Sequence, residues 1–126
     1  MRYLLDTTFL IDYLRGDWAA VSKFGALFEA GDIPTINDIV VCELAAGSRH
    51  DPDPELEALL EPLEFIQPGP ATALLAGRWR QRALRTGRTL SLADALIAAS
   101  SFDCGATVLT RNARDFALTP VAVETY

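Results

Sequence analysis

Two aspartates follow predicted strands and are placed where a folded chain could use them for chemistry. Asp6 comes directly after the apolar run 3–5, and Asp115 follows the apolar run 106–109 after a short polar stretch. Such runs predict buried strands, and open α/β sheets bind their ligands beyond the carboxyl ends of the strands. Asp6 is equally the type of residue that hydrogen-bonds its own backbone in a turn. From this stretch alone both interpretations stay open.

Two further acids interrupt helical segments that are otherwise almost wholly apolar. Glu43 lies within 39–46 and Asp94 within 92–102. An ionised carboxylate in a buried helix is costly unless it is paired or coordinated, which favours a functional role for Glu43. The alternative is a narrow exposed stripe that contains Glu43. Asp94 stands three residues after Ser91, as in a capping box, and that structural role does not exclude metal binding.

If these four acids converge, their chemistry is that of a divalent-cation site. Crowded carboxylates repel one another, so some would keep a proton at neutral pH. Mg²⁺ or Mn²⁺ takes oxygen ligands and removes that penalty. A bound cation can activate water for attack on a phosphodiester and stabilise the leaving oxygen. Such hydrolysis needs no histidine, and His50 is the only histidine in the chain.

The sequence lacks the residues that several other reaction classes need. One histidine and two separated cysteines cannot form a His/Cys zinc site, and a catalytic triad would depend on His50 in a polar loop. Neither GxxxxGK[ST] nor GxGxxG is present. Phosphoryl transfer to an aspartate needs a nearby lysine, but the only lysine is Lys23, in a predicted helix. Where a haloacid-type phosphatase needs a second acid, this chain has Thr8.

Length and composition predict one globular domain, residues 1–126. The 126 residues are 50% hydrophobic, which is enough for a proper core. No apolar run approaches the roughly 20 residues of a membrane span, and no signal-peptide pattern is present. Cys42 and Cys104 lie in apolar helical patterns, which predicts buried thiols in a reducing compartment. We therefore expect a cytoplasmic protein.

The charge balance excludes a nonspecific nucleic-acid binder. The net charge is −6, from 11 basic and 17 acidic residues, whereas such binders are usually basic. Acids that hold cations, or a basic partner, explain the balance better. Five of the bases nevertheless crowd into 78–88, with Arg78, Arg82 and Arg85 at helical spacing. They form either a solvated helix face or a patch that contacts RNA phosphates.

The order of expected elements predicts an α/β fold. It is a three-layer α/β/α sandwich with a central, mostly parallel sheet of four to five strands. Thr7 or Thr8 is expected to cap the first helix. The helices are expected at 9–14, 18–30, 39–46, 54–60, 70–85 and 92–102, and the strands at 3–5, 33–36, 106–109 and, as an edge strand, 121–125, with 63–66 a strand or a connector.

With these elements in place, the chain resembles a PIN-domain ribonuclease, and most closely the VapC-type toxins of bacterial type II toxin–antitoxin pairs. The resemblance covers the whole length in order. Each motif alone is weak, but the four together in a chain of this size are specific. The motifs are Leu4-Leu5-Asp6-Thr7-Thr8-Phe9-Leu10-Ile11, Val41-Cys42-Glu43-Leu44, Ser91-Leu92-Ala93-Asp94-Ala95-Leu96-Ile97-Ala98 and Leu109-Thr110-Arg111-Asn112-Ala113-Arg114-Asp115-Phe116.

The resemblance implies roles for the four acids. Asp6 and Asp94 would be the core metal ligands. Glu43 would help to hold a metal or orient the water, and Asp115 would complete the set. Thr8 and Asn112 match polar positions near the family's site, and the resemblance implies that they are supporting polar residues of the site.

The resemblance also implies an activity and partners. The expected protein is a Mg²⁺- or Mn²⁺-dependent endoribonuclease that hydrolyses a structured RNA, such as tRNA or rRNA. It would be a homodimer, inhibited by a cognate VapB-like antitoxin that folds over it and can place a basic side chain in the acidic cleft. The alternative is a catalytically inactive module of PIN fold that acts through protein contacts.

Overall fold

The computed structural model describes residues 1–126 as a parallel five-stranded sheet with six α-helices. The expected elements are present, and 63–66 contains a strand rather than a connector. The elements are β1 (Arg2–Leu5), α1 (Thr7–Leu14), α2 (Trp18–Glu29), β2 (Ile33–Asn37), α3 (Asp38–Ala46), α4 (Pro54–Leu60), β3 (Glu64–Ile66), α5 (Pro70–Arg85), α6 (Leu92–Cys104), β4 (Thr107–Leu109), the 3₁₀ turn η1 (Ala113–Phe116) and β5 (Val123–Glu124).

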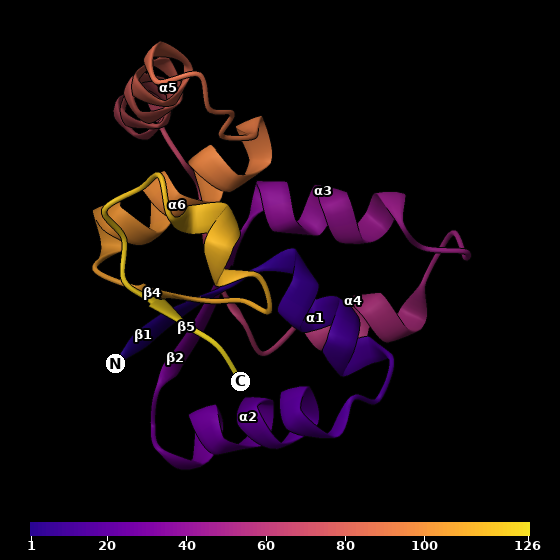
Figure 1. The fold of residues 1–126 in the computed structure, drawn as a ribbon. Coiled ribbons are helices and arrows are strands. Elements are labelled where there is room, and N and C mark those ends of the chain that lie inside the picture. Colours follow the sequence, from indigo (N-terminus) through magenta and orange to yellow (C-terminus); the bar gives the residue numbers. More distant parts are fainter.

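The sheet has the strand order β3-β2-β1-β4-β5, with β1 in the centre. Every pair is parallel, so the carboxyl ends of all five strands lie along one edge. In Figure 1 the strands lie between α2 below and α5 and α6 above, as expected for a three-layer sandwich. Leu5 pairs with Leu109 across β1 and β4. The residues that follow these two strands therefore start side by side.

The helix ends follow local polar chemistry, with one correction. The side chains of Asp17, Asn37 and Ser91 accept hydrogen bonds from the first turns of α2, α3 and α6. The prediction that Thr7 or Thr8 caps α1 is wrong. Both residues lie inside the helix, and Asp6 holds the N-cap position without a side-chain cap bond. The carboxylate of Asp6 instead accepts hydrogen bonds from two hydroxyl groups.

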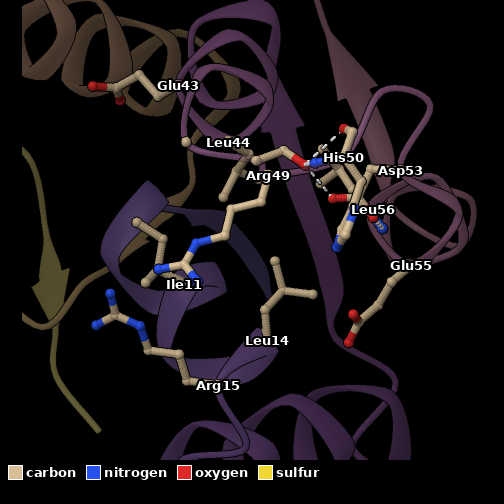
Figure 2. Close-up of a pocket in the computed structure, with 12 residues that line it drawn as sticks. Ile11, Leu14, Arg15, Glu43, Leu44, Arg49, His50, Asp53, Glu55 and Leu56 are labelled. Atoms are coloured by element: carbon tan, nitrogen blue, oxygen red, sulfur yellow. Dashed lines mark hydrogen bonds between the residues drawn. The ribbon is translucent and has the colours of Figure 1, made fainter.

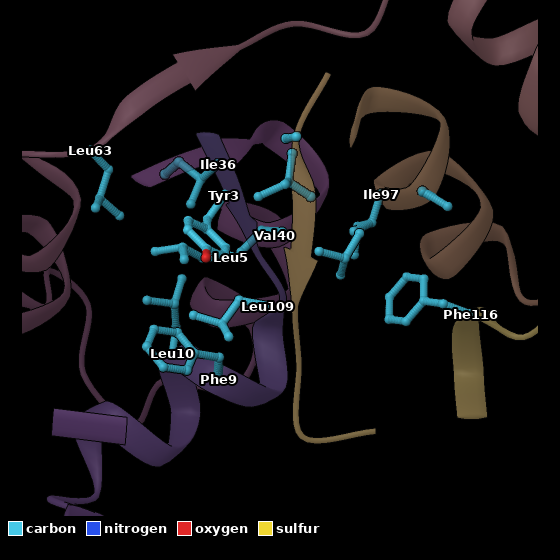
Figure 3. Packing of buried hydrophobic residues seen from close by; sticks show 14 of the residues in the cluster. Tyr3, Leu5, Phe9, Leu10, Ile36, Val40, Leu63, Ile97, Leu109 and Phe116 are labelled. Atoms are coloured by element: carbon cyan, nitrogen blue, oxygen red, sulfur yellow. The ribbon is translucent and has the colours of Figure 1, made fainter. Parts of the chain in front are cut away.

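The core forms where α1 packs against the central strand. Leu5, Phe9 and Leu10 are fully buried and lie together in Figure 3, while Ile97 of α6 and Phe116 of η1 occupy the other half of the picture. Burial of each such side chain contributes about 1.5–3 kcal/mol. This packing fixes α1 against the sheet directly after Asp6.

Of the two interpretations of residues 39–46, the buried helix is wrong and Glu43 lies on an exposed side of α3. Only Val40 and Leu44 are buried, whereas Cys42 and Glu43 are exposed. A helix at the periphery of one domain covers its core on one side only, and an unbroken apolar sequence does not show which side that is. Cys104 is half-buried at the end of α6, so the expectation of two buried thiols fails at Cys42. None of the helices is both long and apolar enough to cross a membrane.

Candidate active site

The carboxylate of Asp6 is buried at the end of the central strand and held by two hydroxyls. Asp6 is 4% exposed. Its Oδ2 accepts a hydrogen bond from Thr8 Oγ1 at 2.8 Å and another from Thr110 Oγ1 at 2.7 Å. Its Oδ1 has no protein partner, and no basic side chain pairs with Asp6. A buried carboxylate without a counter-charge is a costly arrangement that a bound cation would stabilise.

Thr110 is the site residue that sequence reasoning missed. It is fully buried, lies 3.2 Å from the hydroxyl of Thr8, and accepts a hydrogen bond from the backbone N–H of Asn112 at 3.0 Å. The available signal was its position directly after β4, in the same register as Asp6 after β1. A threonine at the end of a strand is unremarkable by type, so only the pairing of the strands marks it.

Glu43 reaches the site from α3 through a threonine of α1. Its Oε1 accepts a hydrogen bond from Thr7 Oγ1 at 2.7 Å. Thr7 is buried and directly follows Asp6, so the bond brings Glu43 beside the start of α1. Glu43 is thus exposed, as the alternative of an exposed stripe described, and its functional role stays a prediction.

Asp94 is affected by all three other acids. Burial is the main cause that raises the pKa of Asp94 from an ordinary 3.8 to about 6. The negative charges of Asp115, Asp6 and Glu43 raise the pKa of Asp94 further, and a hydrogen bond with Ser91 lowers it. The fold therefore brings the four predicted acids into one electrostatic neighbourhood.

Two of these acids share a hollow at the start of α6. We call it the α6 hollow; its volume is about 470 Å³, and it is lined by Arg88, Thr89, Ser91, Asp94, Arg114, Asp115 and Leu118. Leu118 is its one hydrophobic residue. The hollow is therefore a polar cavity in which two carboxylates and two guanidinium groups face the same space.

A second hollow opens beside Glu43. We call it the α1–α3 groove; its volume is about 470 Å³, and it is lined by Ile11, Leu14, Arg15, Glu43, Leu44, Gly47, Ser48, Arg49, His50, Asp53, Glu55 and Leu56. Figure 2 shows Arg49 extending from the loop after α3 toward Ile11, with Arg15 close by and Glu43 at the opposite edge. The groove combines an apolar floor with two basic side chains and adjoins the acid that Thr7 holds.

The loop after β4 is anchored to α1 by the buried Asp12. Asp12 accepts hydrogen bonds from the guanidinium of Arg111 and from the hydroxyl of Tyr126, each at 2.5 Å. The backbone N–H of Arg111 also donates to Thr8 Oγ1 at 3.1 Å. The chain end and the β4 loop are thus tied to the helix that follows Asp6, which keeps Thr110 against the Asp6 carboxylate.

Some of the features expected at the site are not seen in the structure. No three acidic, histidine or cysteine side chains lie close enough together to hold a metal ion as they stand. The side chain of Asn112 makes no hydrogen bond; its backbone N–H bonds to Thr110 instead. Arg78, Arg82 and Arg85 are exposed on α5, and none of them lines the α6 hollow. Their contact with RNA stays a prediction.

Comparison with known proteins identifies the family. Residues 3–121 match the family model of the PIN domain. The protein named Ribonuclease VapC19 from Mycobacterium tuberculosis is 32% identical over 117 residues, which cover 93% of this chain and 94% of the relative. This chain belongs to the PIN-domain family. The match to the family model spans nearly the whole chain.

Solved structures share the fold of this PIN domain at lower identity. A VapBC2 complex from Rickettsia felis, crystallised with a DNA fragment from its promoter, superposes with a TM-score of 0.87 at 23% identity and covers 100% of this chain and 99% of that one. VapBC-1 from Haemophilus influenzae gives 0.84 at 23% identity, with 99% and 98% covered. These neighbours confirm the predicted fold class.

The donor set of the PIN domain is chemically suited to a hard cation. Its oxygens are carboxylate and hydroxyl oxygens, which Mg²⁺ and Mn²⁺ prefer. None of the four acids takes part in an ion pair, and Oδ1 of Asp6 has no partner within the chain. Because no three of the acids stand within ligand distance of one point, shared coordination of one ion requires their side chains to move closer together.

Proposed function

We propose that this PIN domain is a Mg²⁺- or Mn²⁺-dependent endoribonuclease toxin. The observation that carries the proposal is the buried carboxylate of Asp6, which two hydroxyls hold and no basic side chain pairs. Asp94 supports it, because burial and then the charges of Asp115, Asp6 and Glu43 raise the pKa of Asp94 to about 6. A carboxyl that lies close enough to three other acids to be affected by them, where none of the four forms an ion pair, favours cation binding over a purely structural role. The named relative, a ribonuclease, supports RNA as the substrate.

Each acid has a proposed part in hydrolysis. Asp6 and Asp94 would hold the cation, Glu43 would hold the cation or orient the water, and Asp115 would complete the set. The bound cation supplies an activated water and neutralises charge on the reacting phosphate. Thr8 and Thr110 fix the orientation of the Asp6 carboxylate, so one of its oxygens stays directed away from the hydroxyls.

An inhibited state with a VapB-like antitoxin is part of the proposal. The structural neighbours are VapBC complexes, which supports such a partner. The net charge of −6 suits a partner with basic side chains, and the apolar floor of the α1–α3 groove suits a chain segment with apolar anchors. We also expect a structured RNA as the substrate and a second copy of the chain as the partner in a homodimer.

The test of the activity is a cleavage assay on purified chain. The double variant Asp6→Asn, Asp94→Asn should cut a structured RNA at least about 100-fold more slowly than the parent, as removal of an electrostatic stabiliser typically does. EDTA should abolish cleavage by the parent. Asp17→Asn is the matched control, because Asn caps a helix as well as Asp does and this residue lies at α2. Cleavage by the double variant at the parent rate would refute the proposal.

One observation favours the second candidate, an inactive protein-interaction module. The four acids do not stand as a ready-made ligand cluster. In that case the acids would bind basic side chains of a partner, and the purified chain would show neither metal-linked stabilisation nor RNA cleavage. The cleavage assay therefore separates the two candidates.

A further inference from the structure

The α6 hollow holds two arginines that have no partner in the chain. Arg88 lies in the loop between α5 and α6, and Arg114 lies in η1, next to Asp115. Both are exposed and line the hollow. Neither guanidinium takes part in an ion pair, although Asp94 and Asp115 line the same cavity. Their side chains also make none of the chain's hydrogen bonds or cation–π contacts.

Three other basic side chains that lie beside acids are already paired. Arg111 pairs with Asp12, Arg2 with Glu64, and Lys23 with Glu124. An exposed arginine that stays unpaired beside carboxylates is free to bind an anion from solution, and its planar fork fits two phosphate oxygens. Arg88 and Arg114 therefore present unused phosphate-binding capacity beside two of the proposed catalytic acids.

The charge and surface of the hollow also suit a phosphate. Two arginines and two aspartates give it a formal charge of zero, while the whole chain carries −6. A phosphodiester therefore meets less repulsion here than over most of the surface. The first turn of α6 also directs its positive dipole end to this region, capped by Ser91. The α1–α3 groove, by contrast, has an apolar floor.

We propose that Arg88 and Arg114 form a subsite for an RNA phosphate that neighbours the cleaved bond. This inference rests on the proposed function and extends it from the acids to the substrate backbone. The subsite is sequence-independent, because guanidinium groups that contact phosphates position a nucleic acid without reading its bases. It would bring RNA to the acids from the α6 side. Of the two arginines, Arg88 belongs to the basic cluster 78–88 seen in the sequence, whereas Arg114 does not.

RNA binding without cleavage tests the subsite. A fluorescein-labelled, mixed-sequence single-stranded RNA of about 12 nucleotides is titrated with the full chain in EDTA, and Kd is measured by anisotropy over a salt series. The double variant Arg88→Gln, Arg114→Gln should raise Kd about five- to twentyfold at low salt. The slope of log K against log salt should become shallower by about 1.4, or about 0.7 for each lost contact with a single strand.

A matched double variant controls for total charge. Arg2→Gln, Lys23→Gln removes the same two positive charges from residues that pair with Glu64 and Glu124, outside the hollow. It should leave Kd and the salt slope near the parent values. An equal loss in both double variants, or parent values in Arg88→Gln, Arg114→Gln, would overturn the subsite.

Steady-state cleavage distinguishes binding from indirect effects. Loss of a phosphate contact should raise KM and leave kcat within about threefold, because ground state and transition state lose the same interaction. Arg88→Lys, Arg114→Lys should recover part of the affinity, since lysine keeps the charge but not the fork. A fall in kcat with unchanged KM contradicts the subsite. The anisotropy result needs no cleavage, so subsite and nuclease activity can fail separately.

Discussion

At the scale of single residues, the site depends on how Asp6 is held. Two hydroxyls donate to the same oxygen of its carboxylate, from Thr8 and Thr110. Both donors lie on backbone that is itself fixed, one in α1 and one directly after β4. This arrangement determines the rotamer of Asp6 before any ligand binds, which limits the reorganisation required at the reactive centre.

Replacing Thr110 tests that arrangement. Thr110→Val keeps the shape and removes one donor to Asp6, so we expect the cleavage rate to fall about tenfold and stability to fall by about 1 kcal/mol. Thr35→Val is the control, because Thr35 is equally buried in β2 but bonds only to a backbone carbonyl. RNA cleavage and thermal melting provide the measurements. Equal activity of the two variants would show that Thr110 does not position Asp6.

The raised pKa of Asp94 predicts a pH dependence of stability. The folded pKa of about 6 exceeds the ordinary 3.8, so the folded state binds this proton more tightly than the unfolded state. In EDTA, the contribution of protonated Asp94 is complete below pH 3.8 and is lost as pH rises through about 6. The free energy of unfolding, measured with urea, should therefore fall across this window.

The variant Asp94→Asn gives the reference for that measurement. An amide does not titrate, so the variant should lose the part of the decline that belongs to this carboxyl. The difference between the two curves should change between pH 4 and about 6 and stay constant above that. Parallel curves across the whole range would mean that the pKa of Asp94 is not raised.

At the scale of elements, the parallel strands and their helices bring distant acids together. Leu5 and Leu109 are register partners, so Asp6 and the residues after β4 start at neighbouring points of one sheet edge. The helices α3 and α6 deliver Glu43 and Asp94 to the same region, although these residues follow Asp6 by 37 and 88 positions in the chain. Helix ends must therefore stay in place for the acids to meet.

The end of α6 offers a test of that requirement. Gly105 follows α6 with φ +66°, a left-handed conformation that L-residues adopt at a cost of about 1 kcal/mol. Gly105→Ala should lower the free energy of unfolding by about that amount. Gly25→Ala should raise it by about 0.5–1 kcal/mol, because Gly25 lies inside α2 without a positive φ and an added Cβ meets nothing within 4 Å. Urea unfolding measures both, and a sign opposite to either expectation contradicts the assigned conformation.

At the scale of the whole molecule, the excess of acids should make stability depend on divalent cations. If Mg²⁺ or Mn²⁺ binds only the folded chain, a concentration 100 times Kd stabilises it by about 2.7 kcal/mol. The melting temperature of the parent should rise with added Mg²⁺ and return with EDTA. The double variant Asp6→Asn, Asp94→Asn should show no metal-linked rise. A shift of equal size in parent and variant would place the cation elsewhere.

Much of this architecture was predictable from local sequence. Apolar runs marked the strands, and the polar caps with glycines after the helices marked most element ends. The first helix cap and the burial of α3 were not predictable in this way. Asp6, rather than Thr7 or Thr8, takes the cap position of α1 because the strand runs directly into the helix. The apolar sequence of α3 carried no periodicity to show which side faces the core.

The sequence by itself determined the fold class and marked the four acids as candidates, because hydrophobic period, capping residues and spacing are local properties of the chain. Only the tertiary structure decided that Thr110 bonds to Asp6 and that Arg88 and Arg114, rather than the arginines of α5, line the hollow with Asp94 and Asp115. These relations join residues far apart in the chain. They arise from strand register and helix packing, and spacing along the sequence does not encode them.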